Sequence, residues 1–143
     1  MKQLITVIWL LFKQRLLTNS ERRRRHMTQD GGCQICDSDT EDIEHVFKHC
    51  TLAKALWKEL LPPDQFREFT TTDLCDWLTR YLYDKQLHAS WQIRVFVTCW
   101  QLWQARNARL FTDTSQTTSS IACKIRAIVS NSLRSFALVS AFL

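Results

Sequence analysis

Four side chains that can bind a soft metal ion lie within eighteen positions of this chain, from residue 33 to residue 50. Cys33 and Cys36 are spaced so that one tight turn can aim both sulfurs at one ion. His45 and Cys50 lie a little over one helical turn apart, so a helix end can present both from the other side. His49 is a competing imidazole, but one helical turn cannot easily wrap adjacent ligands at 49 and 50 around one ion. The sequence therefore predicts a closed Cys3His site that binds structural Zn2+ and leaves no position for water.

Other uses of these thiols are weaker interpretations. A lone Cys-x-x-Cys in an intracellular chain is also typical of a redox pair, and idle thiols beside a surface histidine would form no site at all. Six cysteines are an even count, which would permit a disulfide framework. However, Cys75, Cys99 and Cys123 each lie within an apolar helical pattern, as buried free thiols commonly do. Nothing else indicates an oxidising compartment, so the metal interpretation is favoured.

The composition favours a single helical domain. A chain of 143 residues fits one domain, and its 45% hydrophobic content, with six Trp and eight Phe, can fill a core. Only two Gly and two Pro argue against a β-rich or disordered chain. We therefore predict a mostly α fold, in which a small Cys3His zinc-stapled helical module is followed by additional amphipathic helices.

Apolar residues recur at helical spacing in several segments. The expected helices cover residues 4–12, 18–31, 51–61, 74–82, 90–111 and 121–143. The first is predicted to be a buried helix of the zinc module. Thr18 and Glu21 have the form of a capping box at the start of the second, which is expected to end near the glycines at 31 and 32. Ser38 or Thr40 is expected to cap the short turn that carries His45. The proline pair at 62 and 63 is expected to end the helix at 51–61.

The densest basic segment precedes the predicted metal ligands, and its cations can contact phosphate. It consists of Lys13, Arg15, Arg22, Arg23, Arg24 and Arg25. Four consecutive arginines spread around a helix, because successive residues are rotated by about 100°. A solvated or internally paired run is equally consistent with this charge pattern. The formal net charge of +5 and the pI near 9.0 fit an anionic partner.

An acidic stretch lies between the second and third predicted ligands. Its five carboxylates are Asp37, Asp39, Glu41, Asp42 and Glu44. Together with three thiolates and one Zn2+ they should repel phosphate, so a nucleic-acid contact must come from elsewhere. We expect the arginine run at 22–25 to pack beside this loop and to be partly neutralised by it.

Several motifs follow one another in a specific order in the first half of the chain. They are Trp-Leu-Leu at 9–11, Arg-Leu-Leu-Thr-Asn at 15–19, Glu-Arg-Arg-Arg-Arg-His at 21–26, Cys33, Cys36, Glu-His-Val-Phe at 44–47, Cys50, Ala53 and Trp57. This order resembles the reverse-transcriptase zinc-binding domain, which occurs toward the C-terminal end of plant non-LTR retroelement polyproteins and in detached descendants in host genomes. The resemblance covers residues 4–62 and implies that the zinc ligands are Cys33, Cys36, His45 and Cys50.

Two details of the resemblance bear on the rest of the chain. Asp37 departs from the small residue that the family often has after the second cysteine. The segment 100–107 is also similar to the family, so the resemblance extends to about residue 111. That segment has no known catalytic role in the family, and its Arg106 and Asn107 are expected to fix helix packing.

The residues that catalysis would need are missing from the sequence. Reverse transcription and RNase H cleavage require clustered carboxylates that hold divalent metal ions. No Tyr-x-Asp-Asp stretch occurs, and no acidic residue follows Asp113. No Gly-rich phosphate loop or Gly-x-Ser-x-Gly motif is present. We therefore predict a non-enzymatic, zinc-binding, nucleic-acid-associating domain with no small-molecule substrate, a remnant of a retroelement polyprotein without its polymerase and RNase H domains.

Three units are expected along the chain: a reverse-transcriptase-type zinc-binding domain at 4–62, a helical extension that packs on it at 63–111, and a polar linker with a C-terminal amphipathic helix at 112–143. RNA or DNA is the expected partner. The rival function is a structural or protein-interaction module in which zinc only stabilises the fold. The apolar run at 4–12 is too short to span a membrane and has only Lys2 before it, unlike a signal peptide. We therefore expect an intracellular protein, nuclear or cytoplasmic, rather than a secreted one.

The C-terminal helix has a single apolar stripe. It consists of Ile121, Ile125, Ile128, Ser132, Phe136, Val139 and Leu143. Lys124, Arg126 and Arg134 lie on the other faces of this helix. The favoured interpretation is that the helix docks on the helices before it. The alternatives are a membrane surface or the groove of a protein partner.

Overall fold

The chain folds into helices only, within the residues that the computed structural model describes. These are the backbone of residues 2–84, 86 and 88–142, and the corresponding side chains as far as residue 135. The elements are α1 (Lys2–Phe12), α2 (Asn19–Arg24), a π-helical turn η1 (His45–His49), α3 (Thr51–Leu60), α4 (Pro63–Thr71), α5 (Leu74–Tyr83), α6 (Ala89–Thr112) and α7 (Thr118–Phe142). This arrangement confirms the predicted mostly α fold.

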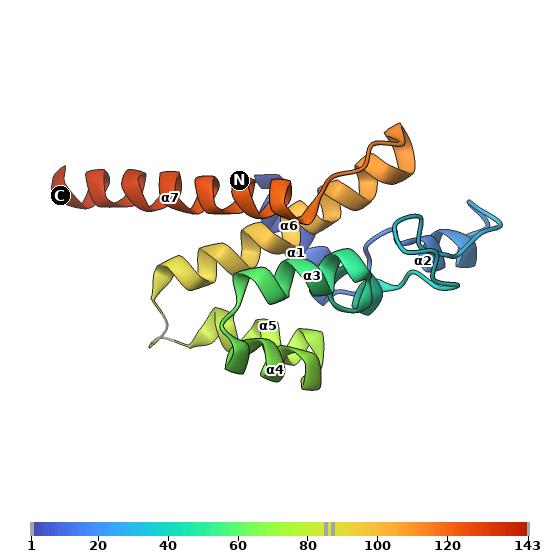
Figure 1. Ribbon diagram of the computed structural model, residues 1–143, viewed down its shortest axis with the longest axis horizontal. Helices are drawn as coiled ribbons and strands as arrows, with labels where there is room; N and C mark the ends of the chain where they lie inside the picture. Colours follow the sequence, from blue (N-terminus) through green and yellow to red (C-terminus); the bar gives the residue numbers. More distant parts are fainter. Residues whose placement is uncertain (1, 85, 87, 143) are drawn as a thin grey trace.

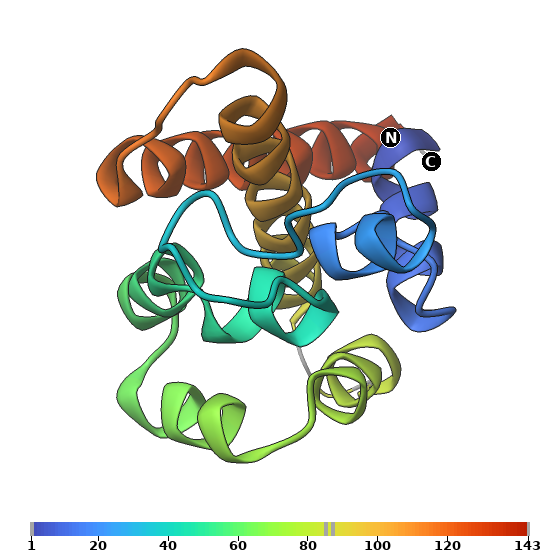
Figure 2. The ribbon, with the colours of Figure 1, turned by 90° about the vertical axis from the view of Figure 1, so that its right-hand side faces the viewer.

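The long helix α6 lies at the centre of the molecule (Figure 1, Figure 2). α1, η1, α5 and α7 all pack against it. A helix of 24 residues is about 36 Å long, so α6 can contact elements from both ends of the chain. Its buried side chains include Val95, Cys99, Leu102, Ala105 and Arg106. This stripe has helical spacing. Its last member, Arg106, is charged and is paired with the buried Glu41.

Aromatic rings from α3, α4 and α5 form a closely packed part of the core. The ring centroid of Trp57 lies 5.0 Å from that of Phe69 and 5.4 Å from that of Trp77. Tyr81 extends the cluster, with its centroid 4.2 Å from that of Trp77. Trp57 also donates an indole hydrogen bond of 2.8 Å to the backbone carbonyl of Phe47. The aromatic core is therefore bonded directly to η1, the element that carries the predicted imidazole ligand.

Helix α4 is a feature that the sequence does not predict. The proline pair ends α3 as expected, but Pro63 is also the first residue of α4. Proline is tolerated there because the first N–H groups of a helix have no intrahelical partner. Phe69 of this helix is 1% exposed, so α4 supplies one ring of the aromatic core.

Helix α1 is buried on one face only. Val7 and Leu11 are buried, whereas Ile5 is 64% and Trp9 is 53% exposed. The prediction of a buried helix is therefore wrong for half of its surface. The apolar residues of α1 surround the helix, but only α6 covers it closely, so one side remains open to solvent.

Helix α2 is much shorter than predicted, because it ends at Arg24 and not near the glycines. His26 adopts a φ of 59°, in the left-handed region. Its N–H donates to the carbonyl of Arg23, and the N–H of Met27 donates to the carbonyl of Arg22. These two bonds form a Schellman motif, which terminates a helix by satisfying its last carbonyl groups.

Helix α7 docks on α6 and α3, as predicted. Ile121, Ile125 and Val129 are buried in this contact, whereas Ile128 is 37% exposed. The buried face is therefore rotated slightly from the predicted stripe, because Val129 and not Ile128 points into the core.

The second half of α7 extends past the other helices (Figure 1). The predicted stripe residues Phe136, Val139 and Leu143 lie outside the residues whose side chains are described. Among the described residues, no helix combines the length and apolar character needed to cross a membrane.

Candidate metal centre

The four predicted ligands converge in space. The ligand atoms of Cys33, Cys36, His45 and Cys50 all lie within 4.8 Å of one another. The sulfurs of Cys33 and Cys50 are 3.9 Å apart, and Cys36 Sγ lies 3.3 Å from His45 Nε2. A tetrahedron with Zn–S bonds of about 2.3 Å and a Zn–N bond of about 2.0 Å has S–S separations of about 3.8 Å and S–N separations of about 3.5 Å. The four residues are therefore positioned to bind a metal ion, and both their spacing and their donor atoms fit zinc.

The first two ligands lie on a tight hydrogen-bonded turn. The N–H of Cys33 donates to the carbonyl of Ser38 at 2.9 Å, and the N–H of Asp37 donates to the carbonyl of Cys33 at 3.0 Å. Asp37 has a φ of 60°, a conformation that Asp tolerates better than most residues, so its departure from the family pattern suits the turn. The N–H of Ile35 points at the sulfur of Cys33, at 3.4 Å. Such a donor stabilises the thiolate form that binds a metal.

Gly32 is required by the close approach of two backbone segments next to this turn. A Cβ atom at Gly32 would lie 2.8 Å from the carbonyl oxygen of Ser38, well inside van der Waals contact. The N–H of Gly32 donates to Asp30 Oδ1 at 2.8 Å, and its carbonyl accepts from Asn19 Nδ2 at 2.8 Å. The turn is therefore attached to the start of α2 through a residue that has no room for a side chain.

The π-helical turn η1 presents the other two ligands. His45 and Cys50 are five residues apart, so in an α-helix they would be rotated by about 140° from each other. In η1 the N–H of Cys50 donates to the carbonyl of His45 at 2.8 Å, and this wider turn brings the two side chains closer to one face. Asp42, and not Ser38 or Thr40 as predicted, caps the turn, because its carboxylate accepts from the N–H of His45 at 2.7 Å.

His49 lies outside the cluster, as the spacing argument predicts. Its side chain is 52% exposed, and Nε2 lies 3.8 Å from a carboxylate oxygen of Glu44. The imidazole that joins the three thiols is that of His45.

Comparison with known proteins agrees with this geometry. Residues 2–57 match the family model described as zinc-binding in reverse transcriptase. All four converging ligands lie within this matched segment. The chain is also similar to a protein of Arabidopsis thaliana that carries a provisional ribonuclease H name, with 27% identity over 113 residues. That similarity covers 78% of this chain but 18% of the relative, so the chain spans less than a fifth of that protein's length. No solved structure matches the chain.

Two buried thiols of the zinc-binding domain are coupled. The sulfurs of Cys33 and Cys50 share a hydrogen bond in which either can be the donor, and this bond lowers the pKa of Cys50. The same hydrogen bond, together with burial, raises the pKa of Cys33. Two thiolates 3.9 Å apart would repel each other, so both can be charged only beside a compensating cation. A bound metal ion supplies that charge, since it deprotonates coordinating thiols.

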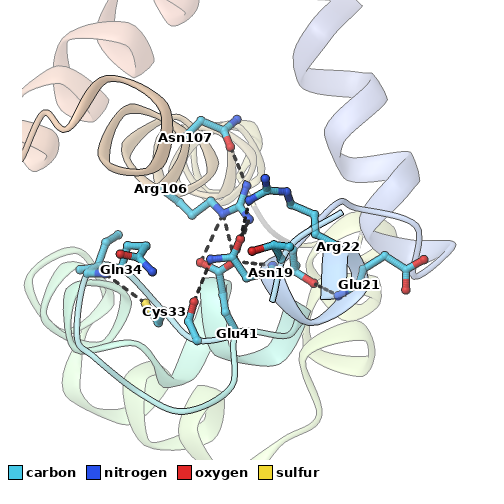
Figure 3. Close-up of polar contacts among 12 residues, drawn as sticks. Asn19, Glu21, Arg22, Cys33, Gln34, Glu41, Arg106 and Asn107 are labelled. Carbon is cyan, nitrogen blue, oxygen red and sulfur yellow. Dashed lines mark hydrogen bonds and ion pairs between the residues drawn. The ribbon is translucent and has the colours of Figure 1, made fainter. Parts of the chain in front are cut away.

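A buried polar network lies behind the zinc-binding turn, and the sequence does not reveal it (Figure 3). Glu41 is 1% exposed and Arg106 is 3% exposed. Arg106 donates through Nε and Nη2 to the carboxylate of Glu41, with a shortest distance of 2.8 Å. The backbone N–H of Asn19 donates to Glu41 Oε1 at 2.7 Å, and the side-chain oxygen of Asn19 accepts from Arg106 Nη2 at 3.2 Å. The network joins the start of α2 and the loop between the second and third ligands to α6, and it confirms that Arg106 fixes helix packing.

The start of α2 lies beside the acidic stretch, as expected, but no ion pair joins the arginine run to that stretch among the described residues. The buried member of that stretch, Glu41, binds Arg106 of α6 and not a residue of the run. Arg24 and Arg25 instead both bind Glu21, each at 2.6 Å. These ion pairs lower the pKa of Glu21 to about 2, with the hydrogen bond from Arg24 as the largest cause.

The capping box at the start of α2 is only half formed. Thr18 accepts from the N–H of Glu21 at 3.4 Å, as predicted. The Glu21 carboxylate does not return to the backbone of Thr18, because it is held by two arginines of its own helix. Local charge therefore overrides the second half of the motif.

The predicted nucleic-acid residues differ in how freely they face solvent. Lys13, Arg15 and Arg23 are exposed, and none of them has a carboxylate partner among the described residues. Arg22 is partly buried, because it donates to Asn19 Oδ1 at 2.9 Å and lies over the ring of Phe111. Three of the six predicted cations are therefore unpaired within the described structure, and the others have intramolecular partners.

Two further side chains bind η1 to the junction of α4 and α5. Lys48 is 7% exposed and donates through Nζ to the backbone carbonyl of Thr72 at 2.5 Å. Glu44 accepts from the backbone N–H of Leu74 at 3.1 Å, at the start of α5. The element that carries His45 is therefore held by the helical extension as well as by its own turn.

The remaining cysteines are not equivalent. Cys99 is buried, and burial raises the pKa of its thiol to about 12. Cys75 is partly buried, and its pKa is also raised, mainly by burial. Cys123 is exposed, which contradicts the expectation that all three are buried. It lies on the solvent side of α7, next to the buried Ala122.

Proposed function

We propose that the chain binds one Zn2+ through Cys33, Cys36, His45 and Cys50, and that it associates with nucleic acid through its basic segment without catalysing a reaction. Four protein ligands complete a tetrahedral zinc site, so no position remains at which zinc could activate water. Zinc bound there supplies a cross-link. In small zinc peptides such a site contributes on the order of 10–16 kcal/mol, which is comparable to the stability of a whole domain.

The observation that carries the nucleic-acid proposal is where the positive charge lies. Residues 13–26 contain six Lys and Arg and one carboxylate, a net charge of +5, which equals the formal net charge of the whole chain. The three unpaired cations, Lys13, Arg15 and Arg23, belong to this segment. A cluster of this kind binds phosphate by displacing counterions.

The acidic stretch beside the metal site should repel the phosphates of a nucleic acid less strongly than its sequence indicates. The charge of Glu41 is compensated by Arg106 in the interior. Glu44 is engaged at the start of α5. Asp37, Asp39 and Asp42 remain as the exposed carboxylates of this loop.

The salt dependence of binding tests this proposal. Zinc-loaded protein is titrated into a labelled single-stranded RNA at several KCl concentrations between about 50 and 200 mM, because each phosphate contact contributes about 0.7 to the slope of log K against log salt. The double variant Arg15→Ala/Arg23→Ala should reduce the magnitude of that slope by about 1.4. The control variant Lys54→Ala/Lys58→Ala removes two exposed cations of α3 and should leave the slope unchanged.

Two results would count against nucleic-acid association. One is the absence of binding at low salt while native mass spectrometry shows one zinc per chain, which would favour the structural or protein-interaction function. The other is an equal loss of slope in both double variants, which would show that any surface cation is sufficient. The same titration with duplex DNA compares the two kinds of nucleic acid.

The division of the chain at 62 and 111 stays a prediction. A single hydrophobic core has members from Val7 to Val129 and so includes all three expected units. This continuity supports cooperative folding of the zinc-binding domain with the helices that follow it.

A further inference from the structure

One aromatic ring beside the basic segment is exposed and takes no part in the core. Phe111 lies in the last turn of α6 and is 64% exposed. It belongs neither to the buried hydrophobic cluster nor to the partly buried side chains that pack against that cluster. A single exposed apolar side chain is common on protein surfaces, so the surroundings of the ring decide whether it can bind a ligand.

The surroundings of Phe111 are cationic. The guanidinium of Arg22 in α2 lies over the ring, with its central carbon 5.6 Å from the ring centroid. Arg22 has no carboxylate partner among the described residues. The carboxylate that lies nearest to Phe111 along the chain, Asp113, is paired with Arg109. The ring is therefore in contact with the basic segment, in which residues 13–26 carry a net charge of +5.

The cation and the helix that carries the ring are both held in place. Arg22 donates through Nη1 to Asn19 Oδ1 at 2.9 Å, and Asn19 is buried (Figure 3). Arg109 donates through Nε to the carbonyl of Gln34 at 3.2 Å. This bond joins the last turns of α6 to the turn that carries the first two metal ligands. Little binding free energy would therefore be lost in ordering these elements around a ligand.

We propose that Phe111 and Arg22 form a stacking site for an unpaired base of a single-stranded nucleic acid. This inference deepens the proposed function and rests on it, because it requires the basic segment to bind phosphates. The base lies on the part of the ring that the guanidinium leaves exposed, and a phosphate of the same strand binds Arg22. A guanidinium has five N–H donors, so the hydrogen bond from Arg22 to Asn19 leaves donors for that phosphate.

A base fits this site better than other occupants do. Every base has a π-face that stacks on an aromatic ring, and single strands bind where such rings lie beside cations. In a duplex the bases are stacked on one another, so they are not free to cover Phe111. A second copy of this chain would bring a further net charge of +5 to a cationic surface. Protein hot spots lie in well-packed, desolvated pockets, whereas the neighbours Thr112 and Asp113 are polar and exposed.

The experiment compares two RNA strands of about 15 nucleotides, oligo(U) and a strand of the same length made of abasic units. Both are titrated into full-length, zinc-loaded protein at several KCl concentrations. The strands carry the same phosphates and differ only in the bases. The parent protein should bind oligo(U) at least about fivefold more tightly, because stacking of one base contributes that factor or more. Phe111→Ala should lose about this factor for oligo(U) and none for the abasic strand. Its salt slope should stay at the parent value, since no charge is removed.

Matched variants separate stacking from other effects of the ring. Phe111→Leu keeps an apolar side chain without an aromatic face and should lose the same affinity, whereas Phe111→Tyr should bind like the parent. Tyr83→Ala removes a ring that is 78% exposed, in α5 and outside the basic segment, and should also bind like the parent. Arg22→Gln should reduce the magnitude of the salt slope by about 0.7 for both strands. Circular dichroism and melting curves establish that each variant is folded.

The inference is overturned if the parent binds both strands equally, or if Phe111→Ala and Phe111→Leu bind oligo(U) as the parent does. An equal loss of duplex and single-strand binding in Phe111→Ala overturns it as well, and so does a dimer of the purified chain that Phe111→Ala dissociates. In these cases the proposed function still stands if oligo(U) binding keeps its salt slope and its dependence on Arg15 and Arg23. If neither strand binds at low salt, the proposed function and this inference both fail.

Discussion

Replacing Arg106 by Met tests whether the buried network holds the zinc-binding domain on α6. The change removes all three hydrogen bonds that Arg106 donates to Glu41 and leaves the Asn19 N–H as the donor to a buried carboxylate. Removing one partner of a buried ion pair costs roughly 3–5 kcal/mol, because the other charge is left uncompensated. Domains of this size are stable by about 5–15 kcal/mol, so this loss is a large share of the total.

Urea denaturation at a fixed free zinc concentration measures this loss as a change in the free energy of unfolding. Zinc must be fixed, because a ligand that binds the folded state raises apparent stability. The matched control is Arg109→Met, about one turn further along α6. Arg109 pairs with Asp113, whose side chain is 86% exposed, so this variant should lose less than about 1 kcal/mol.

A double-mutant cycle with Glu41→Gln then isolates the pair. The two single variants should each be strongly destabilised, and the double variant should lose much less than their sum, because neither charge is left unpaired. The Kd for zinc should also rise in Arg106→Met, since the backbone N–H of Glu41 donates to the carbonyl of Gly31 beside the ligand turn. If Arg106→Met lowers the free energy of unfolding no more than Arg109→Met does, the buried network does not stabilise the fold.

Three further predictions follow from the local structure. In zinc-loaded protein iodoacetamide should modify Cys123 rapidly and Cys99 hardly at all, and chelation should expose three additional thiols, as counted by mass spectrometry. Gly32→Ala should destabilise the protein and weaken zinc binding in a competition titration. Gly31→Ala should have a smaller effect, because its Cβ would meet only the exposed side chain of Arg23, with Cδ at 3.1 Å, and no backbone atom. Thr18→Ala should lower the free energy of unfolding by about 1 kcal/mol in urea denaturation, since it removes the side-chain cap of α2; an unchanged value would show that the cap contributes nothing.

The metal centre could be predicted from the sequence because its constraints are local. Cys33 and Cys36 share one turn, and His45 and Cys50 share another, so the chemistry of zinc restricts both pairs before any tertiary contact is considered. The choice of His45 over His49 follows from the same argument. The longer helices could also be predicted, because their apolar residues recur at helical spacing over many positions.

The ends of the short helices could not be predicted from the sequence in the same way. α2 stops where a single residue, His26, enters the left-handed region, and no glycine marks that position. α4 begins with Pro63, and a proline at this position indicates the end of α3 as well as it indicates the start of a new helix. In both cases one backbone conformation decides the outcome, and composition does not specify it.

The sequence by itself determined which atoms can bind the metal and that the chain is helical, because ligand spacing and hydrophobic period are properties of neighbouring residues. The tertiary structure decided how the charges are used. Glu41 and Arg106 are separated by 65 positions, and each resembles an ordinary surface charge in its own segment. Only the packing of α6 against the ligand loop removes both from water, and a charge in that setting is tolerated only when its partner is there too. The same packing brings α1, α6 and α7 together, so apolar residues that are far apart along the chain line one hollow in space.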